Sequence, residues 1–121
     1  MHRFRKLDVW QAASALARDA YRATMRPGFK GHFGLADQIR RAGISIPANL
    51  AEGYGLGTRP QLIRFTRTAL GSGYELDVLL ELAHDVGVLA PDSFAVLNQG
   101  SNRTISLLIG LLRGLGAPSP K

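Results

Sequence analysis

The chain has 121 residues, with 15 Lys and Arg against nine Asp and Glu, and it contains no cysteine. This length predicts a single domain over residues 1–121, large enough to bury an apolar core without disulfides or a metal. The missing cysteines exclude thiol nucleophiles and Cys-ligated metals, and they fit a reducing compartment. The net charge of +6 leaves an acidic partner open, with nucleic acid first among the candidates.

The N-terminal stretch MHRFRKLDVW is basic, but it runs directly into an amphipathic pattern. It lacks the apolar stretch and the small-residue cleavage site of a signal peptide. No segment of the sequence approaches the length of a membrane span. We therefore expect a soluble cytoplasmic protein with no membrane contact.

The first predicted helix covers residues 9 to 25, and Asp8 is placed to cap its N-terminus. Its apolar stripe is Val9, Ala13, Leu16, Ala20 and Thr24. Pro27-Gly28 ends it, and a glycine-containing loop leads to the second helix at residues 35 to 54. We expect three glycines to end that helix: Gly53, Gly55 and Gly57.

The second helix carries a proline in its middle, which costs about 3 kcal/mol in a helix interior. The residue four before Pro47 is Gly43, whose missing side chain leaves room for a kinked but continuous helix. Asn49 falls on the seam of this helix together with Leu35 and Ala42. Ser45 or Asn49 could compensate the free carbonyl of Gly43, and a buried Asn49 could also fix helix register.

The third and fourth helices are predicted at residues 59 to 86 and 92 to 113. Thr58 and Gln61 form a capping box before the third, which is the clearest boundary signal in the chain. Both helices show a seven-residue register typical of coiled-coil packing. In the third helix the two seam positions are Leu62, Ala69, Leu76 and Ala83, alternating with Phe65, Ser72, Leu79 and Val86. Short connections then predict an all-α, antiparallel, up-down four-helix bundle.

Three stretches resemble the 23S rRNA intervening-sequence protein family, also called the four-helix bundle protein family. They are FRKLDVW at 4 to 10, FGLADQIRRAGISIPANLAEGYG at 33 to 55, and FTRTALGSGYELDVLLELAHDVG at 65 to 87. The resemblance implies a homopentamer of four-helix bundles with no established enzymatic activity. The family is also similar to the accessory protein of diversity-generating retroelements, a basic pentameric barrel implicated in binding nucleic acid and reverse transcriptase. We interpret the central motif as structural or as an interface, with Arg40, Arg41, Pro47, Asn49 and Glu52 as its main residues.

Gly73 departs from the family pattern, in which a larger residue is expected. Together with Gly71 it places two glycines inside a helix, each costing about 1 kcal/mol relative to alanine. Close approach of a neighbouring helix would compensate this cost, and local flexibility is the alternative.

Catalytic chemistry finds little support in the sequence. Glu81 and His84 have the spacing of a di-iron bundle motif, but such a site needs a second copy and two further glutamates. The histidines have no triad context, and the glycine clusters follow no strand. We therefore expect no enzyme activity, no metal and no cofactor.

Charge is distributed unevenly along the chain. Residues 1–67 hold 12 basic and four acidic side chains, a net +8, whereas residues 68–121 hold three and five, a net −2. The third helix is accordingly basic at its start and acidic at its end, against the preference of the helix dipole. An antiparallel bundle would gather the basic segments at one end, which we call the basic end. Its predicted nucleic-acid-binding residues are Arg3, Arg5, Lys6, Arg59, Arg64 and Arg67.

Two functions fit this distribution of charge. The first is non-specific binding of RNA or DNA phosphates by an oligomer. The second is a scaffold whose charges serve subunit pairing and whose partner is another protein. Stacking aromatic residues would favour nucleic acid, but core packing is the simpler interpretation of the three near this end: Phe4, Trp10 and Tyr54.

A second apolar stripe on the third helix predicts self-association, because a lone bundle would leave it partly exposed to water. The predicted interface residues are Ile63, Leu70, Tyr74, Val78 and Leu82. Arg41 and Glu52 lie too far apart on the second helix to pair with each other. We expect their partners elsewhere, across a subunit contact.

Overall fold

The computed structural model describes residues 3–118, which form four α-helices and two short 3-10 helices. The elements in chain order are η1 (Arg3–Lys6), α1 (Asp8–Thr24), η2 (Pro27–Phe29), α2 (Phe33–Leu56), α3 (Arg59–Asp85) and α4 (Pro91–Gly114). The predicted helix bounds lie within two residues of these. Among the described residues, no helix is both long and apolar enough to cross a membrane.

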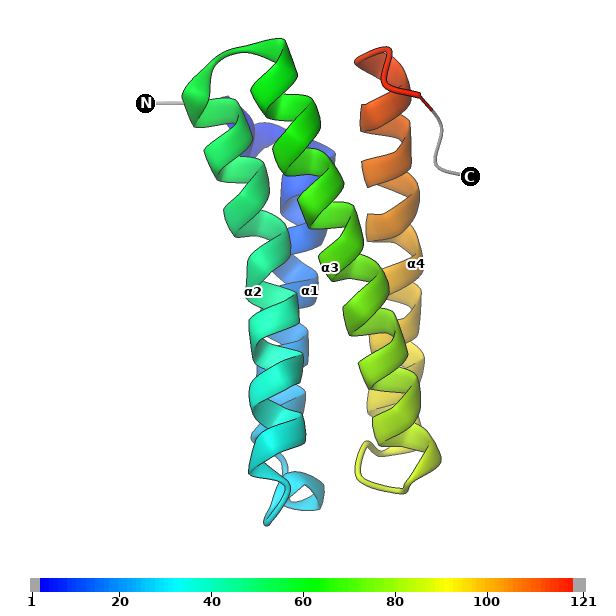
Figure 1. Cartoon of the computed structure of the whole chain (residues 1–121). Coiled ribbons are helices and arrows are strands. Elements are labelled where there is room, and N and C mark those ends of the chain that lie inside the picture. The colour runs from blue at the N-terminus through cyan, green and yellow to red at the C-terminus, as the bar shows by residue number, and fades with distance from the viewer. Residues whose placement is uncertain (1–2, 119–121) are drawn as a thin grey trace.

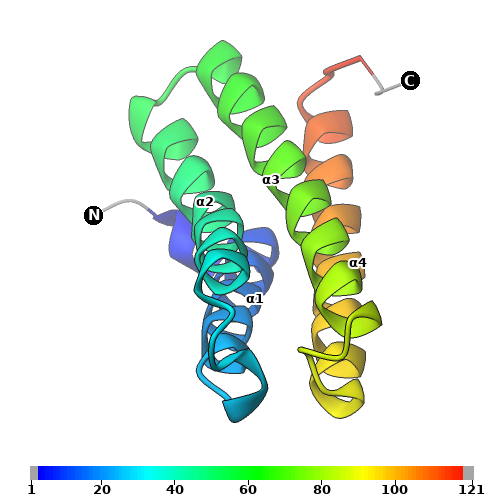
Figure 2. The ribbon, with the colours of Figure 1, turned by 60° about the horizontal axis from the view of Figure 1, so that its bottom comes forward.

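Consecutive helices run in opposite directions, and each packs against two neighbours around the bundle (Figure 1). α1 contacts α2 and α4, and α3 contacts the same two helices. In Figure 1, α2 and α3 lie nearer the viewer than α1 and α4. The connection from α1 to α2 and that from α3 to α4 share one end, which comes forward in Figure 2. This is the predicted up-down four-helix bundle.

The helix ends follow the local signals in part. The Thr58 hydroxyl accepts a hydrogen bond from the Gln61 backbone N–H at 3.3 Å, as a capping box requires. The predicted Asp8 cap is wrong, because α1 already begins at Asp8 and the capping position falls on Leu7. Gly57, with φ of 79°, is the glycine that ends α2, whereas Gly53 and Gly55 lie inside the helix.

The predicted stripe of α1 is entirely buried, but the seam predicted for α3 is only half correct. Ala69, Leu76 and Ala83 are buried, while the second seam position is half-buried or exposed along its length. Thr66, Gly73 and Leu80 are buried in its place. α3 packs against α2 on one side and against α4 on the other. The residues that face the core therefore lie on the helix face between these two contacts.

Gly73 lies where α3 approaches α4. A Cβ atom built on it would sit 3.4 Å from Cγ1 of Ile105 and 3.9 Å from Cδ1 of Leu108. These are ordinary van der Waals distances to side chains, so a methyl group would fit beside α4. Gly73 is buried against α4, but the approach of that helix is not so close that it requires a glycine.

The proline helix is continuous over its full length. The carbonyl of Pro47 accepts a hydrogen bond from Trp10 Nε1 at 3.3 Å, which ties α2 to α1. Asn49 is half-buried rather than on the seam, and Leu50 is the fully buried residue beside it. Asn49 Nδ2 donates to the carbonyl of Ser45 at 2.7 Å and to its hydroxyl at 2.9 Å. The acceptor of Asn49 is therefore Ser45, one turn earlier in the same helix, and not Gly43.

The Ser45 hydroxyl also lies 2.8 Å from the hydroxyl of Ser72, so Asn49 belongs to a small polar contact between α2 and α3. We expect Asn49→Ala to destabilise the protein by about 1 kcal/mol, because it removes half-buried hydrogen bonds without stranding the Ser45 hydroxyl. Urea denaturation measures this, with the exposed Gln38→Ala on the same helix as control. A variant of native stability that has lost ligand binding would instead make Asn49 a binding residue.

Candidate nucleic-acid interface

The predicted phosphate-binding cations all lie at the end where α1 and α3 begin and α2 and α4 end (Figure 1). Three come from η1 and three from the first turns of α3, and all are exposed: Arg3, Arg5, Lys6, Arg59, Arg64 and Arg67. The Phe4 ring stacks on that of Tyr54 with centroids 6.4 Å apart, which holds η1 against the end of α2. Arg113, in the last turn of α4, adds a further exposed cation. Antiparallel packing also predicts Lys121 at this end, but Lys121 lies outside the described residues.

Ion pairs neutralise several cations elsewhere in the bundle. Arg22 pairs with Asp19 at 4.0 Å, Arg26 with Asp92 at 3.5 Å and Arg41 with Asp37 at 2.9 Å. Within residues 3–118, no cation of the basic end lies at ion-pair distance from a carboxylate. In this described part of the chain, salt bridges therefore do not compensate the positive charge of the basic end.

Arg59 has a structural task that the sequence pattern did not reveal. Its Nε donates to the carbonyl of Leu115 at 2.8 Å, and its Nη2 donates to the same oxygen. This places a positive charge at the negative end of the α4 dipole and joins the start of α3 to the end of α4. Arg59 also lines an open cavity of about 500 Å³ beside Tyr54, and among the described residues it is the one charged side chain of the wall. Because its guanidinium is already engaged, we expect Arg59 to contribute less to phosphate binding than the other cations of the basic end.

Two other arginines lie over aromatic rings. The Arg5 guanidinium carbon is 4.8 Å from the centroid of the Phe4 ring, and that of Arg64 is 5.3 Å from the centroid of Phe65. Such cation–π contacts hold the flat face of a guanidinium while its N–H groups still point outward. Both side chains are thus positioned without losing their capacity to bind an anion.

The three aromatic residues of this end pack against one another. Phe4 is buried, and its ring meets Trp10 edge-on at 5.5 Å between centroids. Tyr54 is half-buried, and burial raises the pKa of its hydroxyl, so it stays neutral at physiological pH. This geometry is that of core packing, which leaves little ring surface for stacking nucleobases.

Two of the charged motif residues of α2, Arg40 and Arg41, have partners within the subunit. Arg40 Nε donates to the hydroxyl of Thr24 at 2.7 Å, and its guanidinium lies 4.3 Å from the centroid of Tyr21. Arg40 therefore fastens α2 to α1. Arg41 pairs with Asp37 one turn away, so the structure gives it a partner in its own helix where we expected one on another subunit. Glu52 is exposed, and a partner across a subunit contact stays a prediction.

A family model described as 23S rRNA-intervening sequence protein matches residues 5–110 of the chain. The chain belongs to this family. The matched range includes η1 from Arg5 onward, the proline helix and the whole of α3, so it contains five of the six predicted phosphate-binding residues. Arg3 lies just before it.

A solved structure shares the fold of this 23S rRNA-intervening sequence family member. It is a protein with unknown function from the S23 ribosomal protein family of Bacteroides thetaiotaomicron VPI-5482, determined at 1.70 Å resolution. The two are 24% identical with a TM-score of 0.79, over 87% of this chain and 98% of that one. No curated protein matched the chain.

The residues predicted to form the oligomer interface of this family member differ in exposure. Leu70 is buried in the subunit, and Ile63 is half-buried against the same core. Tyr74, Val78 and Leu82 are 46%, 66% and 49% exposed. Val86 continues their four-residue spacing and is 61% exposed, although the seven-residue pattern places it on the seam. The surface open to a partner is therefore shifted toward the C-terminal half of α3.

Proposed function

We propose that this protein is a non-enzymatic homo-oligomer that binds RNA or DNA at its basic end. The observation that carries the proposal is the group of six exposed cations from η1 and α3 with no carboxylate at ion-pair distance in the described residues. Phosphate recognition needs accessible positive charge, and binding gains free energy from the counterions it releases.

The same geometry favours binding without sequence preference. Lys and Arg contacts to phosphates position a protein on nucleic acid but do not read bases. The aromatic residues that could stack on bases are packed against each other. We therefore propose backbone contacts, led by Arg5, Lys6, Arg64 and Arg67.

Assembly into an oligomer would bring several copies of the basic end together. In a cyclic oligomer whose axis runs along the bundles, all basic ends face the same way and form one ring of cations. The family resemblance implies five subunits, which we adopt as the proposed number. A ring of this kind would bind a longer nucleic acid through several copies at once, with a gain in affinity from multivalency.

A salt titration tests the proposal. Labelled single- and double-stranded RNA and DNA of equal length are titrated with protein at about 50 and 200 mM salt, where phosphate-driven affinity changes by roughly three to five orders of magnitude. We expect binding at the lower salt, a steep loss at the higher salt, and little difference between sequences. Absence of binding at the lower salt would remove the proposal.

A second candidate function is a scaffold whose partner is another protein. The exposed apolar residues of α3 favour it, since Tyr74, Val78 and Leu82 offer a surface suited to protein contacts. This function makes no use of unpaired cations and predicts no salt-dependent nucleic-acid binding. The titration therefore separates the two.

A further inference from the structure

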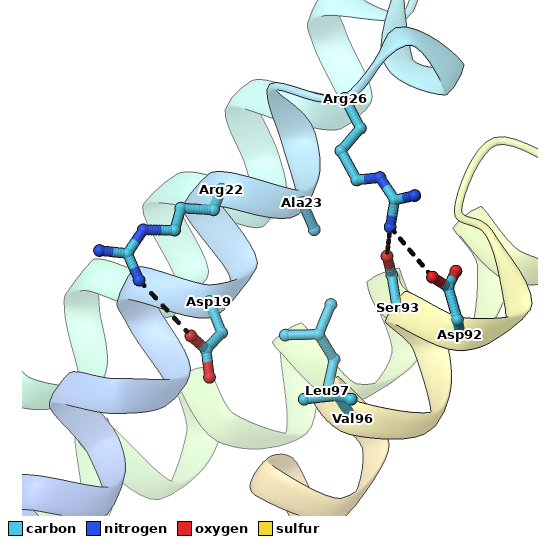
Figure 3. A pocket seen from close by; sticks show the side chains of 8 residues that line it. All are labelled: Asp19, Arg22, Ala23, Arg26, Asp92, Ser93, Val96 and Leu97. Atoms are coloured by element: carbon cyan, nitrogen blue, oxygen red, sulfur yellow. Dashed lines mark hydrogen bonds and ion pairs between the residues drawn. The ribbon is translucent and has the colours of Figure 1, made fainter.

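A groove lies between α1 and α4, in the half of the bundle away from the basic end (Figure 3). Its volume is about 390 Å³. Ala23 and Leu97 are buried at its floor, and Val96 is apolar but 60% exposed. The groove therefore presents apolar surface to solvent in a position where a side chain of another molecule could enter.

Charged pairs border this groove (Figure 3). Arg22 and Asp19 lie on α1, whereas Arg26 reaches across from the end of α1 to Ser93 and Asp92 at the start of α4. The hydrogen bond from the Ser93 backbone and the nearby Arg26 lower the pKa of Asp92, so this pair stays charged into acidic pH. Arg18 adds a third exposed cation four residues before Arg22.

The exposed stripe of α3 has matching properties. Tyr74, Val78 and Leu82 recur every four residues, so they form one line along the helix. Glu81 and Asp85 follow Val78 and Leu82 by three residues, and they therefore flank that line. α3 contains no Lys or Arg from residue 68 onward. The stripe is thus apolar at its centre and acidic at its edge.

The two surfaces lie at the same height on the bundle but on different helices. The C-terminal half of α3, the end of α1 and the start of α4 all belong to the lower half of the molecule in Figure 1. Rotation about an axis parallel to the bundle preserves height, so the stripe of one subunit can meet the groove of the next. A contact between two different surfaces repeats around a ring, whereas a contact of one surface with itself stops at two subunits.

We propose that the α3 stripe of one copy of this chain docks in the α1–α4 groove of a second copy. This pairing rests on the self-association proposed above and assigns both of its surfaces. Val78 and Leu82 pack on Val96 and Ala23 of the neighbour. Glu81 and Asp85 approach Arg22 and Arg26 of the neighbour, whose present ion pairs are exposed and contribute little to stability.

A mixing experiment with two disabled copies tests the pairing. Val78→Lys places a charge in the stripe but leaves the groove intact, and Val96→Asp places one in the groove but leaves the stripe intact. Both sites are well exposed, so neither change should disturb the subunit fold. Mass is measured by light scattering without nucleic acid, and folding by circular dichroism. Leu56→Lys, at an exposed apolar residue of α2 in the other half of the bundle, is the matched control.

We expect wild type and the control to form the full assembly, and each disabled copy alone to be a 13.1 kDa monomer. An equimolar mixture of the two should recover association at one-to-one composition, because the intact stripe of the Val96→Asp copy meets the intact groove of the Val78→Lys copy. A monomeric wild type would overturn the pairing. So would a Val96→Asp variant of wild-type mass, which would show that the stripe pairs with itself or with another face. Neither result depends on whether nucleic acid binds.

Discussion

Charge reversal at Lys6, Arg64 and Arg67 is expected to lower nucleic-acid affinity by roughly a thousandfold at about 50 mM salt, as the loss of three phosphate contacts predicts. The three side chains come from η1 and α3 and are exposed, and none has a carboxylate partner within residues 3–118. The slope of log affinity against log salt should also fall by about one unit for each lost contact. Fluorescence anisotropy with the duplex and single-stranded probes of the titration measures both quantities.

The matched control reverses Lys30, Arg41 and Arg103, which are exposed and lie outside both the basic end and the lining of the α1–α4 groove. Both triple variants change the net charge of the subunit equally, so the comparison separates position from total charge. Arg59 is left intact in both because its bonds to the Leu115 carbonyl hold α4. Equal loss of affinity in the two variants would show that nucleic acid responds to overall charge and not to the basic end.

Gly53→Val is expected to destabilise the protein by about 1 to 3 kcal/mol through overpacking. A Cβ at this position would lie 3.1 Å from both Cδ1 of Leu62 and Cβ of Phe65, and 3.3 Å from Cα of Leu62. Two of these three atoms are fixed to the α3 backbone, so α2 and α3 must separate to admit the side chain. Thermal and urea unfolding measure the loss.

Gly55→Val is the control for this substitution, on the same helix and with the same change. A Cβ on Gly55 meets nothing within 4 Å, and valine is a better helix former than glycine by about 0.5 kcal/mol or less. We expect unchanged or slightly raised stability. If the two variants were equally destabilised, backbone conformation and not contact with α3 would account for the glycine at 53.

The helices and their order were predictable because their signals are local. Pro27-Gly28, Gly57 and the Thr58 capping box mark the boundaries that the structure shows. The gathering of the basic segments at one end followed from antiparallel packing alone. These features depend only on helical periodicity and short connections, and both can be recognised from residues that are close in sequence.

Features that depend on the arrangement of neighbouring helices were not predictable. Asn49 and Leu50 are adjacent, and the seven-residue pattern assigned the seam to Asn49, whereas packing buries Leu50. The same one-position shift occurs in α3, where Gly73 replaces Ser72 on the inward face. Arg59 offers a further case, because its partner Leu115 is distant in sequence and becomes adjacent only in the bundle. The sequence pattern predicts the periodicity of a helix well. The helices that pack against it determine which of its faces points to the core.

The reversed charge order of α3 has a consequence for how the chain folds. A helix with cations at its start, acids at its end and glycines at positions 71 and 73 has little intrinsic helicity as an isolated segment. In the bundle, α3 packs against both α2 and α4. α3 should therefore become helical only as those neighbours assemble around it, and the rate-limiting step of folding should include its docking. The helix that carries half of the proposed phosphate-binding residues, together with the α3 stripe, would then be among the last parts of the chain to form.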